Sequence, residues 1–232
     1  MSAISTVLWD VGGTLLKYAM TSEQFIQDRL AAAGVSLGQL DPDSFRQAEQ
    51  FRRKWELTWR TVSDESEGLG EYVSMLLAGT GVSDDTVRQF AASLAEYHDL
   101  WAVVPGIPTL LADLREAGIL QGIVSNWPPS LRAVLRHHGL DQYFGVIAFS
   151  AECGVTKPDT RIFLWALAEL GVSPGECMFI GDNPDKDIGP ARQLGMQAIH
   201  FDPQERYPVA DARNVDELRR RLRAVLGIAE IA

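Results

Sequence analysis

The chain has 232 residues, of which 46% are hydrophobic and 22% are charged, a composition typical of a folded globular protein. Its formal net charge of −10 at pH 7 argues against binding to nucleic acids or to anionic membrane surfaces. No apolar run is long enough to span a bilayer, and the first residues lack the pattern of a signal peptide. Because Cys153 and Cys177 lie in unrelated contexts, we expect a reducing compartment and a soluble, cytoplasmic protein.

The first predicted element is a buried strand over residues 4–9, a run rich in β-branched and bulky apolar residues without helical spacing. Asp10 follows this strand at its carboxyl end, where open α/β sheets bind their ligands. Gly12 and Gly13 permit a tight reversal directly afterwards, and Thr14 adds a hydroxyl. On this stretch alone, a functional Asp10 and an Asp10 that merely caps a turn are equally good interpretations.

Between Thr21 and Trp101 the sequence shows helix signals and no convincing strand. Thr21 and Gln24 have the spacing of a capping box, which opens a first helix that runs to about residue 33. Asp41 and Pro42 provide an N-cap and a first-turn proline for the next helix. The helices expected in this block cover residues 21–33, 42–61, 70–78 and 84–97.

From Val103 onward, helices and strands are predicted to alternate. The expected strands are 119–124, 146–149, 177–180 and 197–201, and the expected helices are 105–117, 130–138, 158–170, 187–194 and 216–226. This alternation predicts right-handed βαβ units and a parallel sheet, which the first strand joins because a lone strand is not stable. We therefore predict an α/β fold with a core domain, residues 1–16 and 104–232, and an inserted helical domain, residues 17–103. The insertion would lie over the carboxyl ends of the strands.

Polar residues follow the predicted strands at that edge of the sheet. They are Asp10, Ser125, Asn126, Lys157, Asp182 and Asp187. If the three aspartates converge, carboxylates ~5 Å apart repel by about 3 kcal/mol per pair at an effective dielectric constant of ~20, so the cluster needs a cation. An all-oxygen ligand set suits Mg²⁺. With a lysine and a hydroxyl added, the set forms a site for a tetrahedral dianion such as phosphate, which an aspartate nucleophile can attack.

Each element of this set has a purely structural alternative. Asp182 or Asp187 could simply cap the helix that follows, and Ser125 with Asn126 could form an ordinary turn. The four segments in this order, each at a strand end, favour the functional interpretation.

The same residues, in the same order, resemble the haloacid dehalogenase superfamily, subfamily I, the branch with a helical C1 cap inserted after the first strand. The resemblance extends over the whole chain and implies a Rossmann-like parallel sheet core with an all-helical cap domain. It implies that Asp10 is the nucleophile, that Thr14 shapes its loop, and that Ser125 and Lys157 are the phosphate-binding hydroxyl and the lysine of the second and third motifs.

The resemblance also implies a Mg²⁺ site. Asp182 and Asp187 match the acidic residues that hold the ion directly or through water, together with Asp10 and the backbone carbonyl of Gly12. We expect the substrate to be bound by Gly12, Gly13, Thr14, Asn126 and Trp127, the last because it follows the second motif directly and lies at the edge of the site.

The chain departs from the family pattern at Gly12, where phosphatases of the family usually have a second aspartate that acts as general acid and base. A general acid/base contributes about 10²–10⁴-fold, so its loss is expected to raise the barrier by about 3–5 kcal/mol. Lys17 or Tyr18 could replace the proton donor. The dehalogenase branch has a tyrosine at this position and the phosphonate-cleaving branch a small residue with a cap lysine, but Lys54 on the cap is expected to be a solvated surface residue.

From these observations we expect a Mg²⁺-dependent hydrolase, a phosphatase of a small phosphorylated metabolite. Two alternatives stay open. One is a catalytically weakened protein that binds a phosphorylated ligand or a partner, which Gly12 favours. The other is a hydrolase of C–P or C–halogen bonds. We expect no nucleic-acid or membrane partner, and either a monomer or a homodimer.

Overall fold

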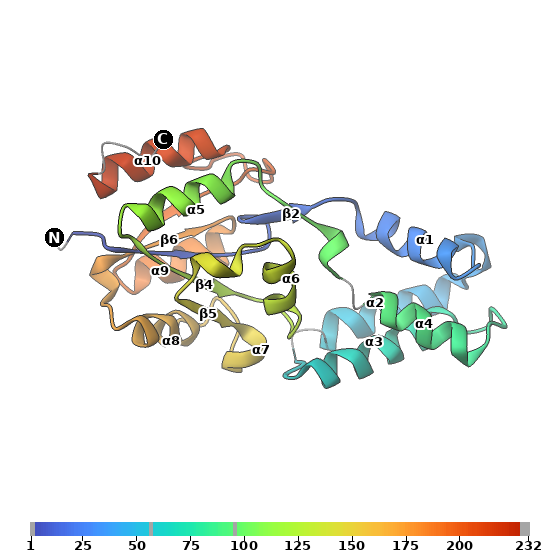
Figure 1. Cartoon of the computed structure of the whole chain (residues 1–232). Helices are drawn as coiled ribbons and strands as arrows, with labels where there is room; N and C mark the ends of the chain where they lie inside the picture. The colour runs from blue at the N-terminus through green and yellow to red at the C-terminus, as the bar shows by residue number, and fades with distance from the viewer. Residues whose placement is uncertain (1–2, 56–57, 95–96, 228–232) are drawn as a thin grey trace.

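The computed structural model describes residues 3–55, 58–94 and 97–227, which form an α/β core and a helical lobe beside it (Figure 1). A five-stranded parallel sheet, in the order β5-β4-β1-β6-β7, runs through the core. Its strands are β1 (Thr6–Trp9), β4 (Leu120–Ser125), β5 (Val146–Phe149), β6 (Cys177–Gly181) and β7 (Gln197–His200). β1 lies in the middle, with Trp9 opposite Ile123 of β4 and Ile180 of β6. The predicted parallel sheet is therefore confirmed, and each strand lies within two residues of its expected bounds.

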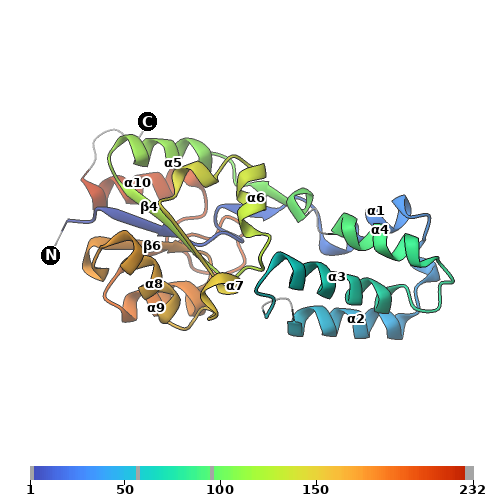
Figure 2. The same cartoon turned by 60° about the horizontal axis from the view of Figure 1, so that its bottom comes forward.

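Helices cover both faces of the sheet (Figure 2). The core helices are α5 (Ile107–Glu116), α6 (Leu131–His137), α7 (Ser150–Cys153), α8 (Arg161–Leu170), α9 (Gly189–Gln193) and α10 (Val215–Leu226). Apolar residues of α5, α6 and α10 pack on one face in a single buried cluster, and those of α8 and α9 pack on the other. Side chains on β1 contribute to both clusters, Val7 and Trp9 to the first and Leu8 to the second, which is why the strand is apolar from Val7 to Trp9.

The helical lobe has a hydrophobic core of its own. Its helices are α1 (Ser22–Ala32), α2 (Pro42–Trp55), α3 (Val62–Leu76) and α4 (Asp84–Leu94). The capping box of Thr21 and Gln24 is confirmed. The predictions of one helix over 42–61 and of a short helix over 70–78 are wrong. Thr61 and Asp64 form a second capping box that starts α3. The helix predicted over 42–61 therefore extends past the end of α2 at Trp55, and the helix predicted over 70–78 misses the first half of α3.

An antiparallel pair of short strands joins the lobe to the core. β2 (Leu16–Tyr18) pairs with β3 (Trp101–Val103), with Tyr18 opposite Trp101. Neither strand was predicted, because three residues carry too little periodicity to identify a strand. The lobe is therefore inserted between β2 and β3 and not directly after β1.

Short turns of other helix types complete the described chain. They are 3₁₀ helices over Leu37–Gln39, Tyr97–Leu100, Asp141–Tyr143 and Pro174–Glu176, and a π-helical turn over Pro184–Ile188. The π-helical turn and α9 replace the helix expected over 187–194. Within the described ranges, no helix combines the length and the apolar character that crossing a membrane requires.

Candidate active site

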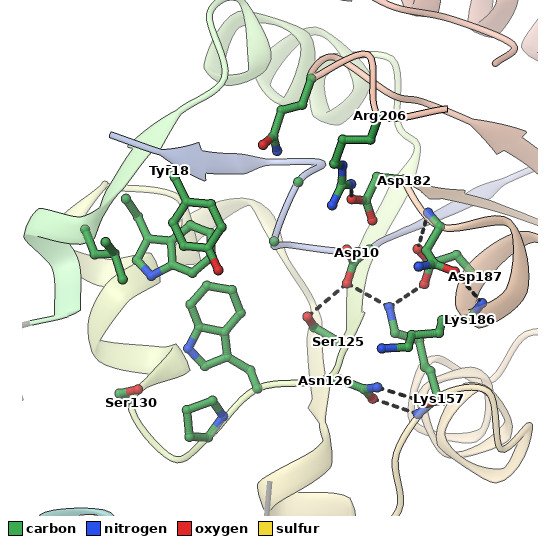
Figure 3. Close-up of a pocket in the computed structure, with 18 of the residues that line it drawn as sticks. Asp10, Tyr18, Ser125, Asn126, Ser130, Lys157, Asp182, Lys186, Asp187 and Arg206 are labelled. Carbon is green, nitrogen blue, oxygen red and sulfur yellow. Dashed lines mark hydrogen bonds and ion pairs between the residues drawn. The ribbon is translucent and has the colours of Figure 1, made fainter. Parts of the chain in front are cut away.

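The carboxyl ends of the strands meet at a cavity of about 340 Å³ between the core and the helical lobe (Figure 3). Asp10 follows β1, Ser125 ends β4, and Asp182 follows β6 directly. Lys157 comes from the segment after α7, and Asp187 from the π-helical turn. All five side chains line the cavity although their residues are far apart in the sequence. The expected convergence of these residues is therefore what the structure shows.

Two donors meet at one oxygen of Asp10. The Ser125 hydroxyl donates to Asp10 Oδ1 at 3.0 Å, and the Lys157 ammonium donates to the same atom at 2.7 Å. Asp10 is 6% exposed, and Ser125 and Lys157 are also buried. No hydrogen bond within the described chain engages the second oxygen, Oδ2. Oδ1 of Asp10 is thus fixed by two hydrogen bonds, whereas Oδ2 is available to react.

The backbone of Lys157 is held by Asn126. The Asn126 side chain accepts from the Lys157 N–H at 2.7 Å and donates to the Lys157 carbonyl at 2.9 Å. The oxygen and the nitrogen of the Asn126 side-chain amide are therefore both hydrogen-bonded to the backbone of Lys157. Asn126 lines the cavity, but its hydrogen bonds position Lys157.

The Lys157 ammonium also donates to Asp187 Oδ1 at 2.6 Å, so it bridges two carboxylates. Burial by itself lowers the pKa of Lys157, but Asp10 and Asp187 outweigh that effect and hold the pKa above its usual value. The pKa of Asp187 is raised to about 6, with burial as the largest cause. The Asp10 carboxylate also raises this pKa, and the Lys157 ammonium lowers it. The site therefore favours the protonated form of Lys157, and it makes the charged form of Asp187 less favourable than it is in water.

Asp10, Asp182 and Asp187 form a group that could hold a metal ion. Each is buried and offers a carboxylate oxygen, and these oxygens lie within 4.8 Å of one another. An all-oxygen set of this size fits a hard divalent cation such as Mg²⁺. Three carboxylates against one lysine leave a negative excess in a low-dielectric site, which a further cation would balance.

Arg206 was not predicted and lies at this site. It comes from the loop after β7 and forms an ion pair with Asp182 Oδ2, while its own side chain is partly exposed (Figure 3). Because β7 ends at the same edge of the sheet as the other parallel strands, the rule that identified Asp10 and Asp182 could have identified this loop. The loop was missed because it has no motif of its own.

Gly13 lies where the loop after β1 comes closest to this ion pair. Its φ is +89°, a left-handed conformation that favours glycine. A Cβ atom here would collide with Asp182 Oδ2 and with the Arg206 guanidinium. Both backbone conformation and space therefore require glycine at this position.

The remaining expected substrate-binding residues divide into two groups. Gly12 and Trp127 line the cavity, as Gly13 does. Thr14 is fully buried outside the cavity lining, and its hydroxyl has no hydrogen-bond partner in the described part of the chain. Of the lysines and the tyrosine considered as functional residues, Tyr18 lines the cavity, whereas Lys17 and Lys54 are not among its lining residues.

The comparison with protein families matches residues 4–195 to the haloacid dehalogenase-like hydrolases. The chain belongs to this family. It is 28% identical over 229 residues to the glyceraldehyde 3-phosphate phosphatase of Methanopyrus kandleri, covering 93% of this chain and 91% of that protein. It is 33% identical over 127 residues to the phosphoserine phosphatase of Thermus thermophilus, covering 54% of this chain and 51% of that protein. A solved haloacid dehalogenase-like phosphatase from Thermococcus onnurineus superimposes with a TM-score of 0.68 at 26% identity, covering 94% of this chain and 98% of that one.

Proposed function

We propose that this hydrolase is a Mg²⁺-dependent phosphatase that acts on a small phosphorylated metabolite through an Asp10 nucleophile. The observation that carries the proposal is the convergence of Asp10, Asp182 and Asp187 around the Lys157 ammonium. Phosphatase relatives of similar length support the reaction class. The Lys157 ammonium, the Ser125 hydroxyl and a cation held by the three aspartates suit a phosphate dianion better than an apolar substrate.

In this proposal Asp10 Oδ2 attacks phosphorus, the bond from phosphorus to the leaving oxygen breaks, and an aspartyl-phosphate forms. Water then hydrolyses this acyl phosphate and regenerates Asp10. Ser125 and Lys157 orient the carboxylate and neutralise charge on the phosphoryl oxygens. A bound Mg²⁺ would be held by the three aspartates, with the Gly12 carbonyl as a further ligand, and would supply charge stabilisation at the phosphoryl group.

We further propose that the helical lobe, residues 17–103, acts as a cap domain on a core of residues 1–16 and 104–232. Arg52, Leu100 and Trp101 bring parts of the lobe and its connection to the cavity wall. Arg60 donates to the carbonyl of Ser150 at 2.9 Å and so ties the lobe to the core beside the site. A cap in this place limits access of bulk water to the aspartyl-phosphate.

A second candidate, a protein that binds a phosphorylated ligand with little turnover, is favoured by one observation. At Gly12, where phosphatases of the family usually have their second aspartate, there is no side chain to donate a proton. Both candidates use the same phosphate-binding residues, so they differ in turnover and not in binding.

The deciding experiment is a phosphate-release screen over phosphorylated metabolites, with Mg²⁺ or with EDTA. The wild type is compared with Asp10→Asn and with Asp185→Asn, an exposed acid in the same loop as the metal-site candidates. We expect Mg²⁺-dependent release that Asp10→Asn abolishes and Asp185→Asn leaves unchanged. Full activity of Asp10→Asn would refute the nucleophile. Saturable phosphate binding without turnover in any variant would support the binding protein.

A further inference from the structure

Three aromatic rings form one wall of the cavity, and nothing in the proposed phosphate chemistry requires them. Tyr18 of β2 stacks on Trp101 of β3 with ring centroids 4.5 Å apart and planes at 24°. Trp101 packs on Trp127, which follows β4, with centroids 4.6 Å apart and planes at 45°. All three rings line the cavity, and we call them the aromatic wall.

The aromatic wall stands directly beside Gly12. A Cβ atom at Gly12 would lie 3.3 Å from the Trp127 ring and 3.6 Å from the Trp101 ring. The rings thus fill the space toward which a side chain at this position would project. The missing aspartate of the family pattern is therefore replaced by apolar ring surface.

The cavity has a charged half and an aromatic half. Tyr18 lies on the opposite side of the pocket from Lys157 and Asp187, with Asp10 between them (Figure 3). A phosphoryl group held by the charged half would direct its ester oxygen and the attached group toward the aromatic wall. Aromatic groups pack well on such rings, either offset or edge to face.

The chemistry of the wall also restricts the leaving group. The described residues on this side of the cavity include no carboxylic acid, and their one acidic hydroxyl is that of Tyr18. A phenol has a pKa of about 10, so an aryl ester can release its leaving group as a phenolate. An ordinary alcohol has a pKa close to that of water, ~15.7, so the alkoxide released from an alkyl ester is a much stronger base and a poorer leaving group. Without a carboxylic acid to protonate the leaving oxygen, esters of the first kind remain good substrates and esters of the second kind become poor ones.

We propose that the site selects phosphate monoesters of aryl alcohols, in which the ring packs on the aromatic wall and the oxygen leaves as a phenolate. The phosphorus–oxygen bond breaks with its electron pair on the leaving oxygen, and solvent later supplies the proton. This inference rests on the proposed phosphatase function and specifies its substrate class.

The test uses three phosphate monoesters and one acyl phosphate, which together separate the ring from the acidity of the leaving group. Phenyl phosphate has both, benzyl phosphate has the ring alone, acetyl phosphate has the acidity alone, and ethyl phosphate has neither. We expect kcat/KM, which reports the steps up to cleavage of the phosphorus–oxygen bond, to be at least about 100-fold higher for phenyl phosphate than for benzyl phosphate, the lower limit of a general acid's contribution. We expect KM to be lower for the two ring esters than for acetyl and ethyl phosphate.

Two variants test the wall itself. Trp101→Leu and Tyr18→Leu should raise KM for phenyl and benzyl phosphate by about 2- to 10-fold, the range of one aromatic contact. Neither should change KM for acetyl phosphate or inhibition by inorganic phosphate, which reports an intact charged half. Tyr18 is half exposed, so its replacement leaves a folded protein to measure.

The outcomes separate this inference from the phosphatase proposal. Equal kcat/KM for phenyl and benzyl phosphate, or ring esters whose KM is unaffected by both variants, overturns the aryl selectivity and leaves the phosphatase in place. Release of no phosphate from any of the four compounds overturns both.

Discussion

Replacing Lys157 by methionine tests how the buried charges of the site are balanced. The ammonium donates to Asp10 and Asp187 at 2.7 and 2.6 Å, and the lysine side chain is 3% exposed. Methionine keeps much of the apolar length and removes the charge. Asp10 and Asp187, which offer oxygens within 4.8 Å of each other, then face each other without the ammonium between them.

The expected loss of stability follows from these distances. Two ionised carboxylates with oxygens no more than 4.8 Å apart repel by at least about 3 kcal/mol at an effective dielectric constant of ~20. Removing one partner of a buried ion pair typically costs about 3–5 kcal/mol. We therefore expect the free energy of unfolding of Lys157→Met, measured in EDTA near about pH 8, to be lower than that of the wild type by about that amount.

The deficit should depend on pH in a defined direction. Burial already raises the pKa of Asp187 to about 6 in the folded protein, above its usual value near 3.8, and loss of Lys157 raises it further. A carboxyl with a raised folded pKa favours the folded state while protonated and loses that benefit as pH rises through the folded pKa. The deficit should therefore be small near about pH 5 and grow toward about pH 8.

Urea unfolding followed by circular dichroism at both pH values measures this effect. Lys186→Met, a change at an exposed lysine in the same loop as Asp187, serves as the matched control and should shift stability by less than about 0.5 kcal/mol. Added Mg²⁺ should recover more stability in Lys157→Met than in the wild type, because the ion supplies the missing positive charge. A deficit that is absent, or that does not change with pH, would refute this account of the charges.

Three further changes have defined outcomes. Gly13→Ala should lower both the melting temperature and the Mg²⁺ affinity, measured by thermal shift with and without Mg²⁺, because a Cβ collides with Asp182 and Arg206 at a positive φ. Thr61→Ala removes the capping box with Asp64, and calorimetry should show a melting temperature about 2–4 °C lower, with full phosphate binding retained. Arg206→Met removes a cation from Asp182 and should lower the Mg²⁺ concentration for half-maximal binding, measured by calorimetric titration, by on the order of tenfold.

The core could be predicted from sequence because its elements carry strong local patterns. The strands before Asp10 and Asp182 are both mostly apolar, since both are covered by helices on two faces. Once parallel strands are predicted, their carboxyl ends must share one edge, which places Asp10, Ser125 and Asp182 together. The convergence of these residues followed from topology without any knowledge of contacts.

The parts that could not be predicted depend on contacts between distant segments. Tyr18 meets Trp101 through a three-residue strand pair whose register no local pattern specifies. Arg206 reaches Asp182 from a loop without a motif. The boundary between α2 and α3 was missed for another reason. The capping box at Thr61 is a local signal, but apolar residues before it suggested that the preceding helix continued to this point.

The departure at Gly12 has a different meaning in the structure than in the sequence. In the sequence it is an absent proton donor, which favours a weakened protein. In the structure the same position is packed against Trp127 and Trp101, and Tyr18 extends that ring surface along the cavity. Loss of a catalytic side chain alone would leave empty or solvated space, whereas these rings come from three separate elements and occupy it. The packing therefore favours a site adapted to leaving groups that need no proton over a site that has decayed.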